Sequence, residues 1–248
     1  MTQLVGILNI TPDSFSDGGQ YLELDEAINR AAQLFQDGAS IVDVGAESTR
    51  PGATILTPEQ EWMRLEPVLT KLIALYPNKI SVDTYHPETT ERVLRLGDVI
   101  INDVTGMNNP EMIEVVLNNH ARIIISHLPG KDIQAAHSGE LIDDVERIKR
   151  ELLQKATYLE SKGLEHEKII LDPGIGFGKT KGLNHKLLKF AELIPEYPVM
   201  IGYSRKRFLG EDRMEIEPNI EAGKIAVDSG ASYLRVHDVE NHAVLVKK

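Results

Sequence analysis

The sequence contains no cysteine among its 248 residues. A disulfide framework, a thiolate zinc site, an iron–sulfur cluster and a cysteine nucleophile are therefore all excluded. Aromatic residues make up only 5% of the chain, and no apolar run approaches the roughly 20 residues that a membrane span needs. The first residues also lack the basic and apolar regions of a signal peptide. We therefore expect a cytoplasmic protein without a membrane partner.

Positive charge is scarce in this chain. There are 27 Lys and Arg residues against 38 Asp and Glu residues, so the formal net charge is −11. This balance argues against broad nucleic-acid binding, because duplex recognition requires a basic face. Anionic small molecules stay open as ligands, since a local basic pocket can form in an acidic protein. The expected partners are therefore small-molecule substrates.

Short apolar runs recur eight times, and each is four to six residues long and rich in Ile, Val and Leu. Such runs are typical of strands buried on both faces. The expected strands cover residues 4–9, 40–44, 79–82, 99–102, 122–126, 168–171, 198–201 and 233–236. Helical patterns separate them, so the alternation predicts a (β/α)8 TIM barrel, an α/β fold, in a single domain over residues 1–248. A doubly wound sheet is the alternative.

The helical segments carry their own start and stop signals. Thr57-Pro58-Glu59-Gln60 predicts an N-cap, a proline in the first turn and a capping box. One long amphipathic helix is expected from Leu141 to Gly163. Further helices are expected over residues 24–35, 183–193, 218–229 and 239–246, with helix starts at prolines 87 and 110.

Polar residues concentrate at the C-terminal ends of the predicted strands, where a barrel carries its chemistry. One group is cationic, which suits a phosphate or pyrophosphate. It consists of Lys206, Arg235 and His237. The second group suits a flat heterocycle rich in N–H donors. It consists of Asp83, Asn102 and Asp172. We therefore expect positive charge to cluster at the barrel mouth and the net negative charge to lie on the helical exterior.

Two readings of this polar ring stay open from the residues alone. A ligand with a donor-rich ring and a phosphate tail would fill both groups. The alternative is a ring of salt bridges that only stabilises the barrel mouth. Asp43, at the end of the second predicted strand, is either part of the site or a brace for it.

Seven ordered motifs, spread from Leu4 to about Asp238, resemble those of the dihydropteroate synthases, a family of pterin-binding TIM barrels. The two longest are GILNITPDSFSDGG at residues 6–19 and GAESTRPG at residues 45–52. The others are SVDT at 81–84, INDV at 101–104, DPGIGFGK at 172–179, SRK at 204–206 and RVHD at 235–238. Because they cover nearly the whole chain in family order, the resemblance is specific.

The resemblance implies a transferase of folate biosynthesis. This activity condenses 6-hydroxymethyl-7,8-dihydropterin pyrophosphate with 4-aminobenzoate and releases 7,8-dihydropteroate and pyrophosphate. The resemblance also implies Mg²⁺ as cofactor with Asn9 as its ligand, competition by sulfonamides, and a homodimer through the C-terminal helices.

The same resemblance implies roles for individual residues. The pterin would be held by Asp83, Asn102, Asp172, Lys206 and Arg235. The pyrophosphate would be bound by Asn9, Arg235 and His237. The aminobenzoate would contact Thr49, Arg50, Pro51, Phe177, Lys206 and Arg207, the last of which stands where the family frequently has a small hydroxyl residue. The catalytic group would be Asp83, Lys206, Arg235, Asp13 and Arg50.

Two functional alternatives remain at this stage. A related pterin barrel could move a methyl group from methyltetrahydrofolate to a corrinoid, which needs the pterin-binding group alone. A paralogue could bind pterins without turnover. The segments Thr49-Arg50-Pro51 and Ser204-Arg205-Lys206 argue against the first alternative, because methyl transfer has no use for them.

Overall fold

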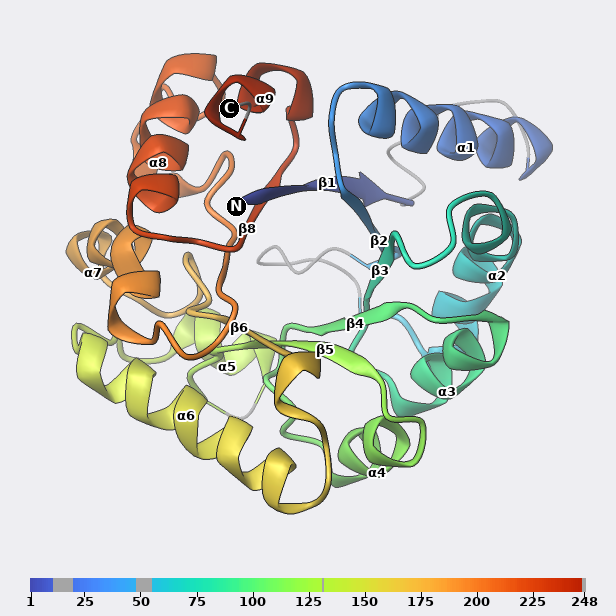
Figure 1. The fold of residues 1–248 in the computed structure, drawn as a ribbon, viewed down its shortest axis with the longest axis horizontal. Coiled ribbons are helices and arrows are strands. Elements are labelled where there is room, and N and C mark those ends of the chain that lie inside the picture. The colour runs from blue at the N-terminus through green and yellow to red at the C-terminus, as the bar shows by residue number, and fades with distance from the viewer. Residues whose placement is uncertain (11–19, 48–54, 131, 247–248) are drawn as a thin grey trace.

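Parallel strands form the centre of the structure and helices surround them (Figure 1). The computed structural model describes residues 1–10, 20–47, 55–130 and 132–246. The strands are β1 Gln3–Asn9, β2 Ile41–Gly45, β3 Ile80–Asp83, β4 Ile100–Asp103, β5 Arg122–Ser126, β6 Ile169–Asp172, β7 Met200–Ile201 and β8 Tyr233–Val236. The α-helices are α1 Gln20–Gln36, α2 Pro58–Leu75, α3 Pro87–Leu96, α4 Pro110–Asn118, α5 Ile133–Ser138, α6 Val145–Ser161, α7 Lys181–Lys186, α8 Ile216–Asp228 and α9 Val239–Val246. Short 3-10 segments are η2 His166–Lys168, η3 Leu187–Leu193 and η4 Arg207–Leu209.

The strands form one parallel sheet in the order β6-β5-β4-β3-β2-β1-β8-β7. The two end strands meet through a parallel bridge between Leu171 and Val199, where the Leu171 N–H donates to the Pro198 carbonyl at 2.9 Å. This contact makes the sheet a nearly closed barrel. The (β/α)8 prediction is therefore confirmed, and the doubly wound alternative is wrong.

The strands bury apolar side chains on both faces, as their continuous apolar runs predict. Outward-facing residues such as Val42, Val82 and Leu171 belong to the large core between strands and helices. Inward-facing residues form a small separate plug inside the barrel, beneath the C-terminal strand ends. The plug consists of Val5, Ile41, Ile100, Ile124, Ile170 and Met200, with Tyr233 against it. The polar residues that come next along the inner face, toward the C-terminal strand ends, therefore lie directly above this apolar plug.

Helix α2 begins as its sequence predicts. The Gln60 N–H donates to Thr57 Oγ1 at 3.2 Å, and the Thr57 N–H donates to Gln60 Oε1 at 3.0 Å. This reciprocal capping box satisfies two N–H groups that the first turn leaves without a partner, and such a cap contributes about 1 kcal/mol.

The expected helix from Leu141 to Gly163 is wrong at its start. Helix α6 begins at Val145, where the Asp144 carboxylate accepts the Arg147 N–H at 3.1 Å. The preceding segment is extended because the Ile142 N–H donates to Gly178 O at 2.9 Å. The expected helix over 183–193 is also divided, into α7 and η3. In the described parts of the chain, no helix is both long enough and apolar enough to cross a membrane.

Candidate active site at the barrel mouth

The strand register brings the predicted pterin-binding residues to one end of the barrel. Asp83, the last residue of β3, is paired with Asn102 on β4 and with Gly45 on β2. Asp172 ends β6 and is paired with Ser126 on β5. Side chains alternate along each strand, so these residues share the inner face with the apolar plug. The carboxylates and the amide therefore lie together, as the sequence predicts.

Arg235 reaches from β8 to two carboxylates on other strands. Its Nε donates to Asp43 Oδ2 at 2.6 Å and its Nη2 donates to Asp83 Oδ2 at 2.8 Å. Burial by itself lowers the pKa of Arg235, but Asp43 and Asp83 outweigh burial and raise it. For Asp83, burial raises the pKa above the usual carboxyl range, and Arg235 opposes that rise. The guanidinium is therefore permanently charged and held from two sides.

Asp43 also holds a second polar residue of the site. Its Oδ2 accepts the Asn102 Nδ2 at 3.1 Å in addition to the Arg235 bond. The Asp43 side chain is completely buried. Of the two readings left open by the sequence, the contacts support a buried brace for the site.

Lys206 lies between the loop after β6 and the site. Its Nζ donates to the Ile175 carbonyl at 2.5 Å and lies 5.3 Å from the centre of the Phe177 ring. Burial lowers the pKa of Lys206 to about 8, and the charge of Asp172 opposes the fall. Burial likewise raises the pKa of Asp172, with Lys206 as the main opposing charge. Lys206 therefore lies against Phe177 of the predicted aminobenzoate-binding group and within range of the charge of Asp172 in the predicted pterin-binding group.

Glycines allow this loop to pass close to its neighbours. Gly174 has φ +66°, and a Cβ there would lie 2.1 Å from the His127 carbonyl oxygen. Gly176 has φ +88°, and a Cβ would lie 3.0 Å from Lys206 Cδ. Both the positive φ and the close approach require glycine. The Gly174 N–H also donates to Asp172 Oδ1 at 2.7 Å, which orients that carboxylate.

The predicted pyrophosphate-binding residues also reach the mouth. His237 follows β8, and its backbone N–H and Nδ1 lie 3.3 and 3.1 Å from Ser204 Oγ. Asn9 is exposed at the end of β1. Arg207 is exposed at the start of η4. Asp13, Thr49, Arg50 and Pro51 lie outside the described residues.

The expected separation into a cationic and an anionic group is wrong for the described residues. Arg235 lies between Asp43 and Asp83, and the charge of Asp172 acts on Lys206. Carboxylates are therefore interleaved with the cations at the mouth. The positive charges do gather there, since Arg235 lowers the pKa of Lys206, but each is also paired with negative charge. The physical reason is that a buried charge must be paired to offset its desolvation.

Comparisons with known proteins address the identity of this site. The family model described as "Pterin binding enzyme" matches residues 5–237. The dihydropteroate synthase of Staphylococcus haemolyticus is 38% identical over 99% of this chain and 93% of the relative. The chain belongs to the dihydropteroate synthase family of pterin-binding enzymes. The alternative of a corrinoid methyltransferase has no support in these relatives.

Solved dihydropteroate synthases share the fold closely. The Xanthomonas albilineans enzyme, solved with 4-aminobenzoic acid, has a TM-score of 0.88 and 35% identity over 98% of this chain and 90% of its own. The Anaplasma phagocytophilum enzyme, solved with bound 6-hydroxymethylpterin-monophosphate, has a TM-score of 0.85 and 32% identity over 99% of this chain and 96% of its own. Those two structures therefore contain molecules of the two kinds that the resemblance implies as substrates.

Sequence reasoning missed the role of Lys179 in this member of the dihydropteroate synthase family. The side chain is buried, and its Nζ donates to the carbonyls of His127 at 3.1 Å, Gly174 at 2.8 Å and Phe177 at 2.9 Å. It thereby ties the loop after β6 to the loop after β5. The sequence offers only the lysine at the end of DPGIGFGK as a signal, and nothing in that motif indicates three carbonyl acceptors.

The Glu47 contacts were also not predicted. Its carboxylate accepts the Leu56 N–H at 2.7 Å and the Tyr85 hydroxyl hydrogen at 2.5 Å. Glu47 and Leu56 flank the segment that contains the predicted aminobenzoate-binding residues 49–51. The hydrogen bonds therefore hold the two flanks of this segment together.

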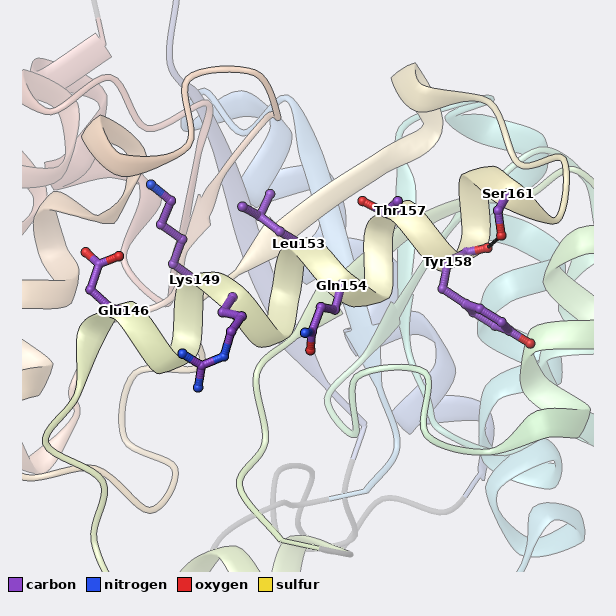
Figure 2. A pocket seen from close by; sticks show the side chains of 8 residues that line it. Glu146, Lys149, Leu153, Gln154, Thr157, Tyr158 and Ser161 are labelled. Carbon is purple, nitrogen blue, oxygen red and sulfur yellow. Dashed lines mark hydrogen bonds between the residues drawn. The ribbon is translucent and has the colours of Figure 1, made fainter.

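A shallow hollow also lies along the outer face of α6 (Figure 2). Every side chain that lines it comes from this one helix, at spacings of one to four residues. The lining residues are Glu146, Lys149, Arg150, Leu153, Gln154, Thr157, Tyr158 and Ser161. It contains none of the predicted site residues.

His127 is expected to make this fold sensitive to acid. Its pKa falls from 6.5 to about 4, chiefly because the ring is buried and also because of the charge of Lys179, while Glu151 opposes the fall. The unfolded chain therefore binds a proton that the folded chain rejects, so stability falls as the pH drops from about 6.5 to 4. The loss from this residue is about 3 kcal/mol, at 1.36 kcal/mol per pKa unit.

Urea unfolding at pH 7 and pH 4 measures this loss. His127→Asn is expected to flatten the pH dependence, while exposed His120→Asn leaves it unchanged. An unaltered pH dependence in His127→Asn would show that the acid sensitivity has another origin.

Proposed function

We propose that the barrel mouth condenses 6-hydroxymethyl-7,8-dihydropterin pyrophosphate with 4-aminobenzoate to give 7,8-dihydropteroate and pyrophosphate. The observation that carries the proposal is the convergence of Asp83, Asn102 and Asp172 with Lys206 and Arg235 at one end of the barrel. Carboxylate and amide oxygens accept hydrogen bonds from the N–H groups of a pterin, and the cations suit the pyrophosphate. Membership in the dihydropteroate synthase family supports the same reaction.

The proposed reaction is a displacement at the exocyclic methylene carbon of the pterin. The amine nitrogen of 4-aminobenzoate forms a bond to that carbon while the C–O bond to pyrophosphate breaks and its electron pair leaves with pyrophosphate. The amine proton is then lost to water or to the departing pyrophosphate. The aromatic amine is neutral at pH 7, so attack needs no general base.

The residues of the mouth would favour this displacement by charge and by position. Ionised Asp83, next to the pterin ring, would stabilise positive charge that develops on the methylene carbon. Arg235 and His237 would bind the pyrophosphate as negative charge grows on it. Lys206 and Phe177 would hold the aminobenzoate in line with the breaking bond, which lowers the entropic cost of attack. Sulfonamides, which resemble aminobenzoate, would bind in the same place.

Mg²⁺ is part of the proposal, with Asn9 as the residue that would hold it. The Asn9 side chain is exposed at the end of β1, and an amide oxygen is a donor that Mg²⁺ accepts. No cluster of three or more His, Cys, Asp or Glu in the described residues could hold a metal ion by itself. The residues therefore fit an ion bound mainly by water and by pyrophosphate oxygens, as is usual for Mg²⁺. The bound ion would neutralise charge on the leaving group.

Removal of divalent ions is expected to abolish turnover. Asn9→Ala should raise the Mg²⁺ concentration required for half-maximal rate by about tenfold, since one protein ligand is lost. The exposed residue Asn118 at the end of α4 provides the matched control, and Asn118→Ala should leave the requirement unchanged. Full activity in the presence of a chelator of divalent ions would show that the reaction does not need Mg²⁺.

The turnover assay tests the proposed function. Purified protein is mixed with Mg²⁺, the pterin pyrophosphate and labelled 4-aminobenzoate, and labelled dihydropteroate and pyrophosphate are quantified. Equal amounts of the two products are expected, with none formed when either substrate is omitted. Folded protein that binds the pterin in calorimetry without making product would instead identify a non-catalytic paralogue.

We also propose that α8 and α9 form the contact surface of a homodimer. The two helices pack on each other, and their exposed apolar side chains include Ile216, Ile225 and Val244. Such side chains are common at subunit contacts. The cytoplasmic location stays a prediction.

A further inference from the structure

We propose that Asp43 is a buried positioning residue that fixes Arg235 and Asn102 for the pterin. This inference rests on the proposed function, because it concerns how the pterin-binding residues are held. Asp43 itself would not contact the pterin.

The strand register places Asp43 level with the residues that it holds. Asp43 is in register with Ser81 on β3, and Ser81 is in register with Ile100 on β4, two residues before Asn102. The strands of a (β/α)8 barrel are tilted, so each level of inward-facing side chains comes from alternate strands. Asp43, Asn102 and Arg235 come from the alternate strands β2, β4 and β8 and occupy one level. The buried Asp43 carboxylate therefore holds both neighbours from within that level.

One oxygen of Asp43 accepts both hydrogen bonds. Oδ2 receives the Arg235 Nε at 2.6 Å and the Asn102 Nδ2 at 3.1 Å. Arg235 comes from β8, which is separated from β2 by β1 in the sheet, and Asn102 comes from β4, on the other side of β3. A single atom thus sets the relative position of two side chains from opposite sides of β2.

The burial of a carboxylate at this position costs folding free energy. Asp43 is 0% exposed, and among the described residues its Oδ1 has no hydrogen-bond partner. A buried carboxylate with a bare oxygen is costly to desolvate. Because Oδ2 nevertheless accepts hydrogen bonds from two site residues, a role in holding the site explains why a carboxylate is present in spite of its desolvation cost.

Asp43 also acts on the charge of Asp83. Burial is the main cause that raises the pKa of Asp83, Arg235 lowers it, and the negative charge of Asp43 raises it again. The titratable groups that act on Asp83 or receive its charge are Arg235, Asp43, Asp103, Glu47, Glu61, Tyr85 and Lys206. Without the charge of Asp43, the pKa of Asp83 falls, because a repulsive neighbour is gone and Arg235 has one carboxylate left. This shift is a readout that loss of packing alone would not produce.

The test compares Asp43→Asn with two matched variants in the turnover assay. Asp103→Asn removes another completely buried carboxylate, which among the described residues accepts hydrogen bonds from Thr105 and the Met107 N–H. Ser81→Ala removes a buried polar group that is in register with Asp43 on the adjacent strand. Asp43→Asn is expected to raise KM for the pterin pyrophosphate about tenfold and to leave KM for 4-aminobenzoate unchanged. The two matched variants should leave both KM values near those of the wild type.

The pH profile gives the second readout. The acid limb of kcat/KM for the pterin pyrophosphate should move to lower pH in Asp43→Asn, and by less in Asp103→Asn, whose charge acts more weakly on Asp83. Equal changes in both KM values, equal behaviour of Asp43→Asn and Asp103→Asn, or an unmoved acid limb would each overturn the inference.

The failure of the proposed function and the failure of the Asp43 inference give different results. If the wild-type protein makes no dihydropteroate, the proposed function fails before Asp43 is tested. If Asp43→Asn does not fold, Asp43→Ser is measured in its place, because a smaller neutral side chain fits the same space. If neither variant folds, Asp43 serves the fold and the inference is overturned.

Discussion

Lys206→Ala is expected to lower kcat/KM for dihydropteroate formation by about a hundredfold to a thousandfold, the range found when a buried stabilising donor is removed from an active site. The Lys206 ammonium lies near Asp172 and 5.3 Å from the Phe177 ring centre. Its removal leaves buried Asp172 without its main opposing charge and takes a cation from the place where the two substrates are proposed to meet. Steady-state kinetics in both substrates measures the effect.

Lys224→Ala is the matched control for this change, because Lys224 is exposed on α8. Lys206→Arg keeps the charge, but Gly176 is packed closely against the Lys206 stem, so the bulkier group should restore only part of the rate. Wild-type kinetics in Lys206→Ala would remove the residue from the site. A lost thermal unfolding transition would instead attribute the effect to the fold.

Asp83→Asn is expected to lower turnover by about a hundredfold with the fold intact. The substitution removes the negative charge proposed to stabilise the cationic methylene carbon, and it takes one carboxylate from Arg235, which keeps Asp43. Because burial raises the pKa of Asp83, its ionised form is costly in the folded state, and loss of the charge should not destabilise the barrel. Single-turnover kinetics at saturating substrate separates this loss of rate from a change in binding.

Asp98→Asn serves as the comparison, since Asp98 is an exposed partner of Arg122 outside the mouth. Its rate should equal that of the wild type. If Asp83→Asn reduced only the affinity for the pterin and left the single-turnover rate unchanged, the residue would bind substrate without stabilising the transition state.

The fold was predictable because its signals are local. Each strand is an apolar run, and each polar strand end such as Asp83 or Asp172 marks the position where the run leaves the core. The start of α2 was equally predictable, since the capping box from Thr57 to Gln60 lies within four residues. Residues whose place follows from their own strand were therefore located correctly.

Features that depend on contacts far along the chain were not predictable. Helix α6 starts later than expected because the backbone of Ile142 is hydrogen-bonded to Gly178 and Thr180. The amphipathic pattern of the sequence does not indicate these hydrogen bonds. The strand ends left a ring of salt bridges open as one reading, but Arg235 meets Asp43 across 192 positions of sequence, so the particular partners could not be predicted. The sequence shows which of these residues are positive and which are negative. Only the folded structure shows which of them form ion pairs.

The site divides in the same way. The motifs place Asp83, Asn102, Asp172, Lys206 and Arg235 at the mouth, and the structure brings these five together. Supporting contacts, such as the Ser204 hydroxyl on His237, join residues from different loops and have no sequence signature. The residues proposed to touch substrate were thus easier to predict than those that hold them.

A crystal structure with the pterin pyrophosphate bound tests the central claim most directly. The account predicts the pterin ring against Asp83, Asn102 and Asp172, with the pyrophosphate toward Arg235 and His237 and the methylene carbon open toward Phe177. A pterin bound at another place would contradict the account. So would a ligand that makes no contact with Arg235 and Lys206 and leaves them bound only to their carboxylate partners.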